Sequence, residues 1–228
     1  MYIGAKANLE NRRYQDPEYY RKRRLRRRRR RRRALILITL ELAALVLIIT
    51  FAIRFFTCNN KNVDRLEVAR ETEIPDWIDV QLIDEGNPSR TGLKLDGVNN
   101  IVVHYVGNPQ TTAQQNRNFY NQEDSNVCSH FVIGMDGEII MCVPLEERSS
   151  ASNHRNHDTI SIEVCHPDET GEFTAESYES LVKLVDWLLD QFALEPEDVI
   201  RHYDITGKEC PLYYVEHPDA WDAFLDDL

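Results

Sequence analysis

The chain has 228 residues, of which 42% are hydrophobic, and a formal net charge of −11 at pH 7. This length allows one globular domain with additional segments, and the apolar content excludes a chain that is disordered throughout. The charge is divided unevenly, because residues 1–33 contain 15 Lys and Arg against 3 Asp and Glu, whereas residues 55–228 contain 11 against 34. Net charges of +12 and −23 predict that the two parts face different environments.

An apolar segment separates these two parts. Residues 34–53 form a run of 20 in which Glu41 is the only ionisable group. A helix of this length, at about 1.5 Å per residue, spans the hydrocarbon core of a bilayer. The run predicts one transmembrane helix in preference to a buried core helix, which is rarely apolar on every face, or a cleaved signal peptide, which is shorter. Glu41 either snorkels toward the preceding arginines or marks a helix contact.

An arginine cluster precedes this apolar run, at Arg23–Arg33 with only Leu25 interrupting. Because cationic flanks stay on the cytoplasmic side, we expect residues 1–33 to be a basic cytoplasmic tail and residues 54–228 to be extracytoplasmic. The predicted protein is therefore a single-pass protein of the cell membrane, with anionic lipid of the inner leaflet as the partner of the tail. Nucleic acid, which basic blocks also bind, is only a secondary alternative as the partner of this tail.

The elements beyond the membrane segment alternate between strands and helices. Residues 54–73 are polar with weak helical periodicity and predict a juxtamembrane stalk, and residues 74–83 predict an extended or edge segment that opens a domain at 74–228. Short β-branched or alternating runs predict strands at 101–106, 130–134, 138–143, 159–165 and 199–201, and helical spacing predicts helices at 111–121, 174–192 and 219–225. This order predicts an α/β domain with a mixed central sheet flanked by helices.

Two histidines and a cysteine lie near the ends of these predicted strands. His104 belongs to strand 101–106, His202 directly follows strand 199–201, and Cys210 comes eight residues later, beyond Gly207. Two neutral imidazoles and a thiolate fill three positions of tetrahedral zinc and leave the fourth open, as a catalytic zinc site requires. The chain has seven histidines and five cysteines. Spacing alone therefore leaves open the alternative that His104 is a core histidine bonded to backbone.

Four motifs in sequence order add a family resemblance. They are VVHYVGNP at 102–109, SHFVIGMDGEII at 129–140, DTISIEVCHPDETG at 158–171 and RHYDITGKECP at 201–211. Together they resemble the type 2 N-acetylmuramoyl-L-alanine amidase family, which includes phage lysozyme-type amidases and peptidoglycan recognition proteins. The resemblance covers residues 99–228 and nothing before them.

The resemblance implies a role for five residues. His104, His202 and Cys210 match the family's ligands for one zinc ion. Glu163 matches the acidic residue that serves as general base in one branch, and Lys208 matches the catalytic lysine. The implied reaction is zinc-dependent hydrolysis of the amide between the N-acetylmuramoyl lactyl group and L-alanine in bacterial peptidoglycan. In this reaction a cation such as Lys208 stabilises the negative charge that develops on the carbonyl oxygen.

The sequence departs from the family pattern in two places. Ser129 stands where other members have a tyrosine that assists catalysis, which assigns the base role to Glu163. Residues 149–158 read SSASNHRNHD where the family often carries a Trp-His-Ala segment. Substrate contacts by His154 and Asn156 are accordingly the weakest of the predicted roles.

The other cysteines leave their pairing open. Disulfides are permitted outside the cell, and a Cys142–Cys165 bond is only one of the pairings among four cysteines. Those two also lie within apolar strand patterns, where plain buried thiols occur. The cysteines concerned are Cys58, Cys128, Cys142 and Cys165.

The features of the sequence are compatible with three functions. The first is a membrane-anchored amidase in cell-wall remodelling or turnover. The second is a non-catalytic module of the same fold that recognises muropeptides, and the third is a membrane scaffold whose acidic domain binds a basic partner. Because recognition-only relatives typically lose the cysteine ligand, the presence of both Cys210 and Glu163 favours the enzyme.

Overall fold

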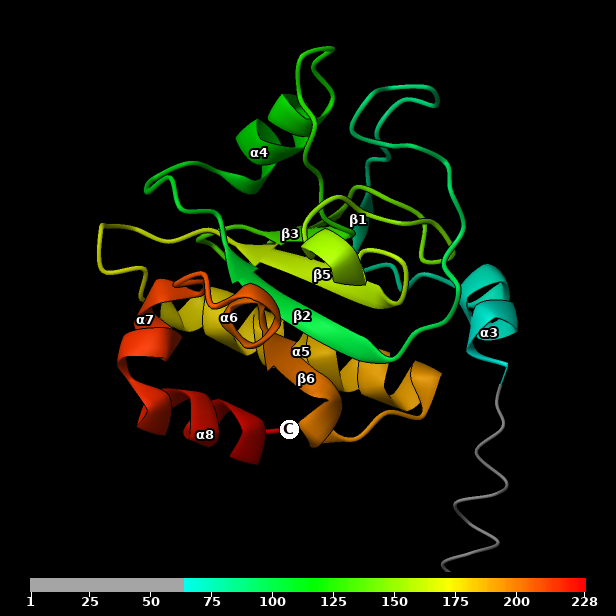
Figure 1. Cartoon of the computed structure of the whole chain (residues 1–228). Helices are drawn as coiled ribbons and strands as arrows, with labels where there is room; N and C mark the ends of the chain where they lie inside the picture. Colours follow the sequence, from blue (N-terminus) through cyan, green and yellow to red (C-terminus); the bar gives the residue numbers. More distant parts are fainter. Residues whose placement is uncertain (1–63) are drawn as a thin grey trace, which may run out of the picture. The chain divides into compact units, whose positions relative to one another are not determined.

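The structure, a computed structural model, describes residues 64–228 (Figure 1). The basic tail predicted at 1–33, the transmembrane helix predicted at 34–53 and the first part of the predicted stalk lie outside the described residues. Among residues 64–228, none of the helices combines the length and the apolar character needed to cross a membrane.

A six-stranded sheet forms the centre of the described domain, with the strand order β1-β4-β3-β5-β2-β6. The strands are β1 (Asp79–Val80), β2 (Asn100–Tyr105), β3 (Phe131–Ile133), β4 (Ile139–Met141), β5 (Thr159–Val164) and β6 (Val199–Arg201). Strands β3 and β4 pair in antiparallel fashion, and the other neighbours in this sheet are parallel. The prediction of a mixed sheet is confirmed.

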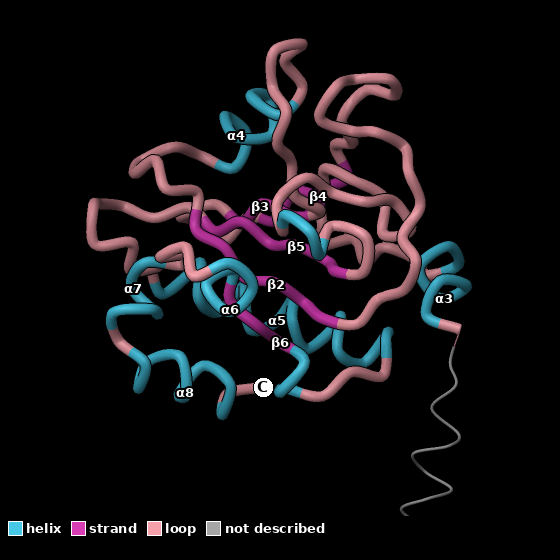
Figure 2. Tube along the Cα trace, viewed as in Figure 1, coloured by secondary structure: helices cyan, strands magenta, loops and turns pink. Residues whose placement is uncertain are grey.

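Helices cover both faces of this sheet, with α5 on one side and α4 on the other (Figures 1 and 2). The helices are α3 (Arg65–Glu71), α4 (Ala113–Tyr120), α5 (Ala175–Phe192), α6 (His202–Thr206), α7 (Leu212–Glu216) and α8 (Pro218–Asp226), with short 3₁₀ turns η1 (Asn153–Arg155) and η2 (Pro196–Asp198). Alternate residues of each strand point to opposite faces, which gives the domain two apolar clusters.

The larger cluster lies between the sheet and α5. The hydroxyl of Thr174 accepts a hydrogen bond from the backbone of Ser177 and caps the start of this helix. Ala193, in the left-handed conformation, caps its end. Leu181, Leu184 and Leu188 recur at helical spacing and are almost completely buried against the strands. Each such leucine contributes about 1.5–3 kcal/mol of transfer free energy. This face of the sheet is therefore the structural core, which leaves the other face for a site.

Helix α3 falls within residues 54–73, which the sequence assigns to a stalk, and it packs on the domain. Ala69 is buried in the larger cluster. The guanidinium of Arg65 donates to the carbonyl oxygens of Phe192, Val98 and Ala193 at 2.7, 2.9 and 3.0 Å. The local sequence does not reveal these contacts because the accepting carbonyls lie on distant segments.

Candidate metal centre

The carboxyl ends of three parallel strands, β2, β5 and β6, meet at one edge of the sheet. His104 and Glu163 are the next-to-last residues of β2 and β5 and face each other in register. Because Ile101 and Val103 pack toward α5, the alternation of the strand turns His104 to the opposite face. His202 directly follows β6 as the first residue of α6.

A short loop brings Cys210 back to these histidines. Gly207 ends α6 with a φ of +76°, a conformation that glycine adopts without steric cost. The backbone N–H of Tyr203 then donates to the carbonyl of Cys210 at 2.9 Å, which closes the loop beside His202. The Cys210 Sγ lies 3.8 Å from His104 Nδ1. One potential ligand atom from each of the three buried side chains lies within 4.8 Å of the other two.

The two imidazoles are oriented by neighbouring residues of a single turn. The Nε2 of His202 lies 2.6 Å from Asn153 Oδ1, and the Nε2 of His104 lies 3.4 Å from Ser152 Oγ. The Nδ1 of His202 is buried and has no hydrogen-bond partner. Two imidazoles and a thiol that converge in this way, with an unsatisfied buried nitrogen among them, fit a zinc ion.

Burial controls the protonation of these ligands. It lowers the pKa of His104 well below its usual value, and the neighbouring His202 and Lys208 lower it further. Burial also lowers the pKa of His202. Both histidines are therefore neutral near pH 7, the form that binds a metal. Burial raises the pKa of the Cys210 thiol to about 12, whereas a cation among these ligands would favour the thiolate.

Glu163 stands next to the three candidate ligands. Its Oε1 lies 4.0 Å from His104 Nδ1, and its side chain is 18% exposed. Its Oε2 is buried without a hydrogen-bond partner. Burial raises the pKa of this carboxyl to about 8, and the Lys208 ammonium acts in the opposite direction. The carboxyl group is thus held beside the three candidate ligands with one oxygen free for a further contact.

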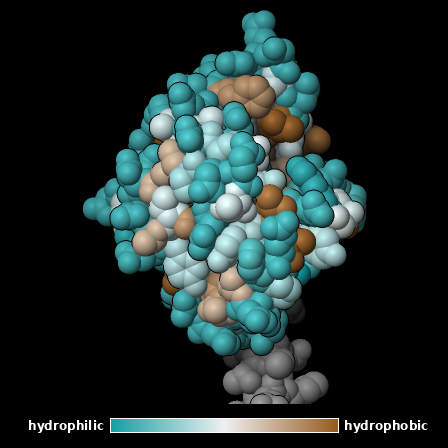
Figure 3. All heavy atoms as spheres, turned by 90° about the vertical axis from the view of Figure 1, so that its left-hand side faces the viewer, coloured by the Kyte–Doolittle hydropathy of each residue, from teal (hydrophilic) through white to brown (hydrophobic). Residues whose placement is uncertain are grey.

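A cleft of about 580 Å³ opens over this centre. His104, Glu163, His202 and Lys208 line one part of it, and Phe119 and Val127, each 47% exposed, line another part. The remaining lining residues are Val106, Asn108, Thr111, Gln115, Asn116, Tyr120, Cys128, Ser150 and Ala151. The side of the domain seen in Figure 3 is largely hydrophilic with small hydrophobic patches. The volume suits a ligand of small-molecule or oligomer-fragment size.

The weakest predicted site residues lie away from the walls of the cleft. His154 is exposed on η1, and the side chain of Asn156 accepts a hydrogen bond from the backbone of Ser152 at 2.6 Å. Their contacts with substrate stay predictions. The residues that sequence reasoning missed are Ser152 and Asn153, which touch the two histidines. No local motif marks them, since their role depends on contacts across 48 and 49 positions.

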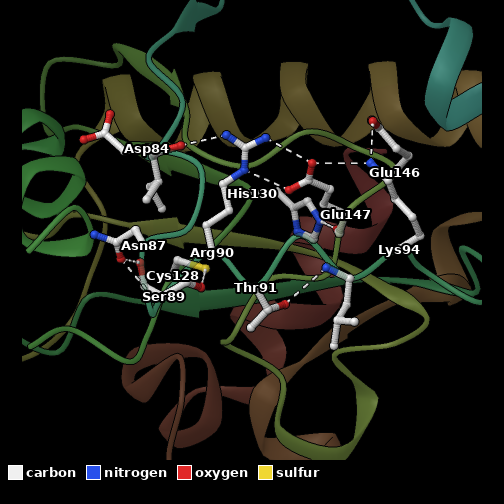
Figure 4. Close-up of polar contacts among 12 residues, drawn as sticks. Asp84, Asn87, Ser89, Arg90, Thr91, Lys94, Cys128, His130, Glu146 and Glu147 are labelled. Atoms are coloured by element: carbon white, nitrogen blue, oxygen red, sulfur yellow. Dashed lines mark hydrogen bonds and ion pairs between the residues drawn. The ribbon is translucent and has the colours of Figure 1, made fainter. Parts of the chain in front are cut away.

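A buried polar network anchors the segment that leads to the turn at Ser152 and Asn153 (Figure 4). The Arg90 guanidinium donates to both carboxylate oxygens of Glu147 at 2.8 and 3.0 Å, and both side chains are less than 10% exposed. The backbone carbonyl of Glu147 contacts His130 Nε2 at 2.9 Å, and His130 Nδ1 lies 3.1 Å from Ser161 Oγ on β5. Ser149 Oγ also lies 2.7 Å from Ser161 Oγ. The segment before Ser152 is thereby bound to the sheet.

The cysteines of the described domain are free thiols, namely Cys128, Cys142, Cys165 and Cys210. Cys128, Cys142 and Cys165 are buried in the apolar cluster under α4. Burial raises the pKa of Cys142 and of Cys165 to about 12. Cys58 lies outside the described residues.

The fold and the site together define a class, an α/β domain with two histidines and a cysteine that could hold a metal ion at the carboxyl edge of its sheet. The profile of the Amidase_2 family, described as N-acetylmuramoyl-L-alanine amidase, matches residues 94–212. The chain belongs to this family.

Individual relatives agree with this assignment. The N-acetylmuramoyl-L-alanine amidase BlyA of Bacillus subtilis (strain 168) is 31% identical over 157 residues, which are 60% of this chain and 42% of the relative. The chain thus matches less than half the length of this curated relative. The solved catalytic domain of XlyA is 26% identical and superimposes with a TM-score of 0.58 over 66% of this chain and 97% of that domain. PlyL, at 22% identity and a TM-score of 0.59, shares the fold.

Proposed function

We propose that this chain hydrolyses the amide bond between the N-acetylmuramoyl lactyl group and L-alanine in bacterial peptidoglycan, with one zinc ion held by His104, His202 and Cys210. The observation that carries the proposal is the convergence of these three side chains beside Glu163 in an open cleft. Zinc at this position supplies Lewis acidity, which lowers the pKa of water and polarises a carbonyl group.

Two side chains of the cleft complete the chemistry. Glu163 lies beside the ligands, and a cation held there would favour its carboxylate form. As a carboxylate, Glu163 accepts a proton from the attacking water and then delivers it to the amine of the departing L-alanine. Lys208 lines the same cleft and directs its ammonium toward the carbonyl oxygen as negative charge develops there. A donor of this kind contributes about 2.7–4 kcal/mol of transition-state stabilisation.

The products identify the reaction. Incubation of the 228-residue chain with purified peptidoglycan is expected to release free muramoyl carboxyl groups and new L-alanine amines in equal amounts. A chelator removes this activity and added Zn²⁺ restores it. New reducing sugar ends would instead indicate a glycosidase. Zinc-dependent binding of muropeptide with no new amines would identify the recognition module.

We also propose that residues 34–53 anchor the protein in the cell membrane, with residues 1–33 in the cytoplasm and the domain outside. The support comes from the sequence, in the 20-residue apolar run and the net charge of +12 that precedes it. An enzyme tethered in this way works on wall material close to its own membrane, which suits remodelling or turnover.

A further inference from the structure

We propose that Asn153 is a positioning residue of the metal centre, which sets the tautomer of His202 so that its Nδ1 binds the metal. The inference rests on the proposed function, since it concerns zinc at His104, His202 and Cys210. It deepens that function by assigning the orientation of one ligand to the turn at residues 152–153.

The hydrogen bond between Asn153 and His202 determines where the imidazole proton resides. An amide oxygen only accepts hydrogen bonds, so the Nε2 of His202, 2.6 Å from Asn153 Oδ1, carries the proton. The Nδ1 of the same ring then has a free lone pair. This is the buried nitrogen that has no hydrogen-bond partner.

The backbone of Asn153 supports a functional role for this contact. Its φ is +54°, a left-handed conformation that few non-glycine residues adopt and that asparagine tolerates better than most. An ordinary L-residue is strained in such a conformation, because its Cβ lies too close to a carbonyl oxygen of the backbone. The surrounding structure holds it, because the segment before Ser152 is bound to the sheet through Ser149 and Glu147. The amide is thus presented to His202 by an anchored turn.

The neighbouring Ser152 contacts the other histidine in a parallel but weaker way. Its Oγ lies 3.4 Å from His104 Nε2, at the outer limit of a hydrogen bond, whereas the Asn153 contact is 0.8 Å shorter than this. Both histidines consequently direct Nε2 toward residues 152–153. His104 turns Nδ1 toward Cys210 Sγ, at 3.8 Å. Asn153 is the stronger of the two anchors.

The test compares the zinc affinity of variants of the 228-residue chain by competition with a chromogenic chelator. Asn153→Gly removes the acceptor without backbone strain, because glycine adopts positive φ freely. Asn153→Asp keeps an oxygen at the same place. Ala193→Gly is the matched control, since Ala193 also has a positive φ of +47° but caps α5. Substitution of a residue that hydrogen-bonds to a metal ligand typically weakens metal binding about 10- to 100-fold.

The expected result is that Asn153→Gly loses zinc affinity by about 10- to 100-fold, while Asn153→Asp and Ala193→Gly retain the parent's affinity. Unchanged affinity in Asn153→Gly overturns the inference. An equal loss in Asn153→Asp, or in Ala193→Gly, overturns it as well, because the effect would then not depend on the oxygen acceptor. If the parent chain binds no zinc, the proposed function and this inference both fail. If the parent binds zinc and Asn153→Gly binds it equally well, only this inference fails.

Discussion

His104 and His130 are both fully buried, yet their surroundings assign them different tasks. Both ring nitrogens of His130 have partners, in Ser161 Oγ and the carbonyl of Glu147. The Nδ1 of His104 faces the Cys210 sulfur and the Glu163 carboxyl instead. Burial lowers the pKa of both histidines. A buried histidine is therefore a candidate ligand only where one nitrogen remains available.

Glu163→Gln tests the proton-transfer role of this carboxyl. The amide has nearly the same shape but does not accept a proton, so turnover of a soluble muropeptide is expected to fall about 100- to 10,000-fold. Zinc content should stay at the parent level, because the proposed ligands are His104, His202 and Cys210. Metal analysis and amine release on the same preparation check both statements. Turnover at the parent rate would contradict the assignment of the base.

His130 is expected to make the stability of the domain pH-dependent. Burial lowers its pKa from 6.5 in the reference state to about 4. Folding favours the neutral imidazole, so His130 makes its full contribution to the free energy of unfolding above pH 6.5. This contribution is lost as the pH falls from 6.5 to 4. This shift corresponds to about 3 kcal/mol in the free energy of unfolding.

Urea unfolding of the metal-free chain between pH 7.5 and 4 measures this effect. His104 and His202 titrate in the same direction, so the comparison is between the parent and His130→Gln. The variant should lose less stability than the parent over this interval. Equal losses in the two proteins would show that His130 is not the source.

Among the loops, the segments around Arg90 and Glu147 depend on each other. Their bidentate ion pair is almost completely buried, and the third guanidinium nitrogen of Arg90 donates to the carbonyl of Ile83 at 2.7 Å. Figure 4 shows this pair beside His130. The Arg90 guanidinium holds the pKa of Glu147 below its usual value through their hydrogen bond. The loop before β2 and the loop after β4 thereby form one unit.

Arg90→Met is expected to destabilise the domain by about 3–5 kcal/mol, because it leaves the Glu147 carboxylate buried without its partner. The matched control is Arg148→Met, which breaks an ion pair with Asp96 whose side chains are 30% and 61% exposed. Its expected cost is about 1 kcal/mol or less. Chemical denaturation of the three proteins at pH 7 measures the difference. Equal costs for the two variants would contradict a stabilising role for the buried pair.

Over the whole chain, charge and hydropathy separate a basic N-terminal segment from an acidic C-terminal part. The first 33 residues carry +12 and residues 55–228 carry −23, on either side of the apolar run at 34–53. The described residues contain no helix suited to crossing a membrane. Membrane attachment, as we propose it, thus depends on the run at 34–53.

The proposed topology predicts the behaviour of the protein in cell fractions. The 228-residue chain should sediment with membranes and resist extraction by alkaline carbonate, because a spanning apolar helix is not released by breaking electrostatic contacts. Protease added outside spheroplasts should degrade the domain. Deletion of residues 34–53 is the control and should release the protein. Extraction of the parent by carbonate would contradict a membrane span, and a protected domain would reverse the orientation.

Much of the fold was predictable from local patterns. Strand β6 begins and ends where β-branched residues predict it, and α5 begins one residue after its predicted start because Thr174 is its cap. These features depend on side-chain periodicity and capping, which operate over a few residues. The short helices α6 and α7 were not predicted, because each has only five residues and too little periodicity to recognise.

By itself, the sequence determined the class of fold, the family and the identity of the three candidate ligands, because each is expressed in local patterns and ordered motifs. Only the tertiary structure decided which nitrogen of each histidine faces the centre, that Asn153 and Ser152 hold the other nitrogens, and that α3 packs on the domain. These outcomes depend on contacts between residues 48 to 128 positions apart. Such contacts form when the strands and loops pack together, so no short segment of the chain contains them.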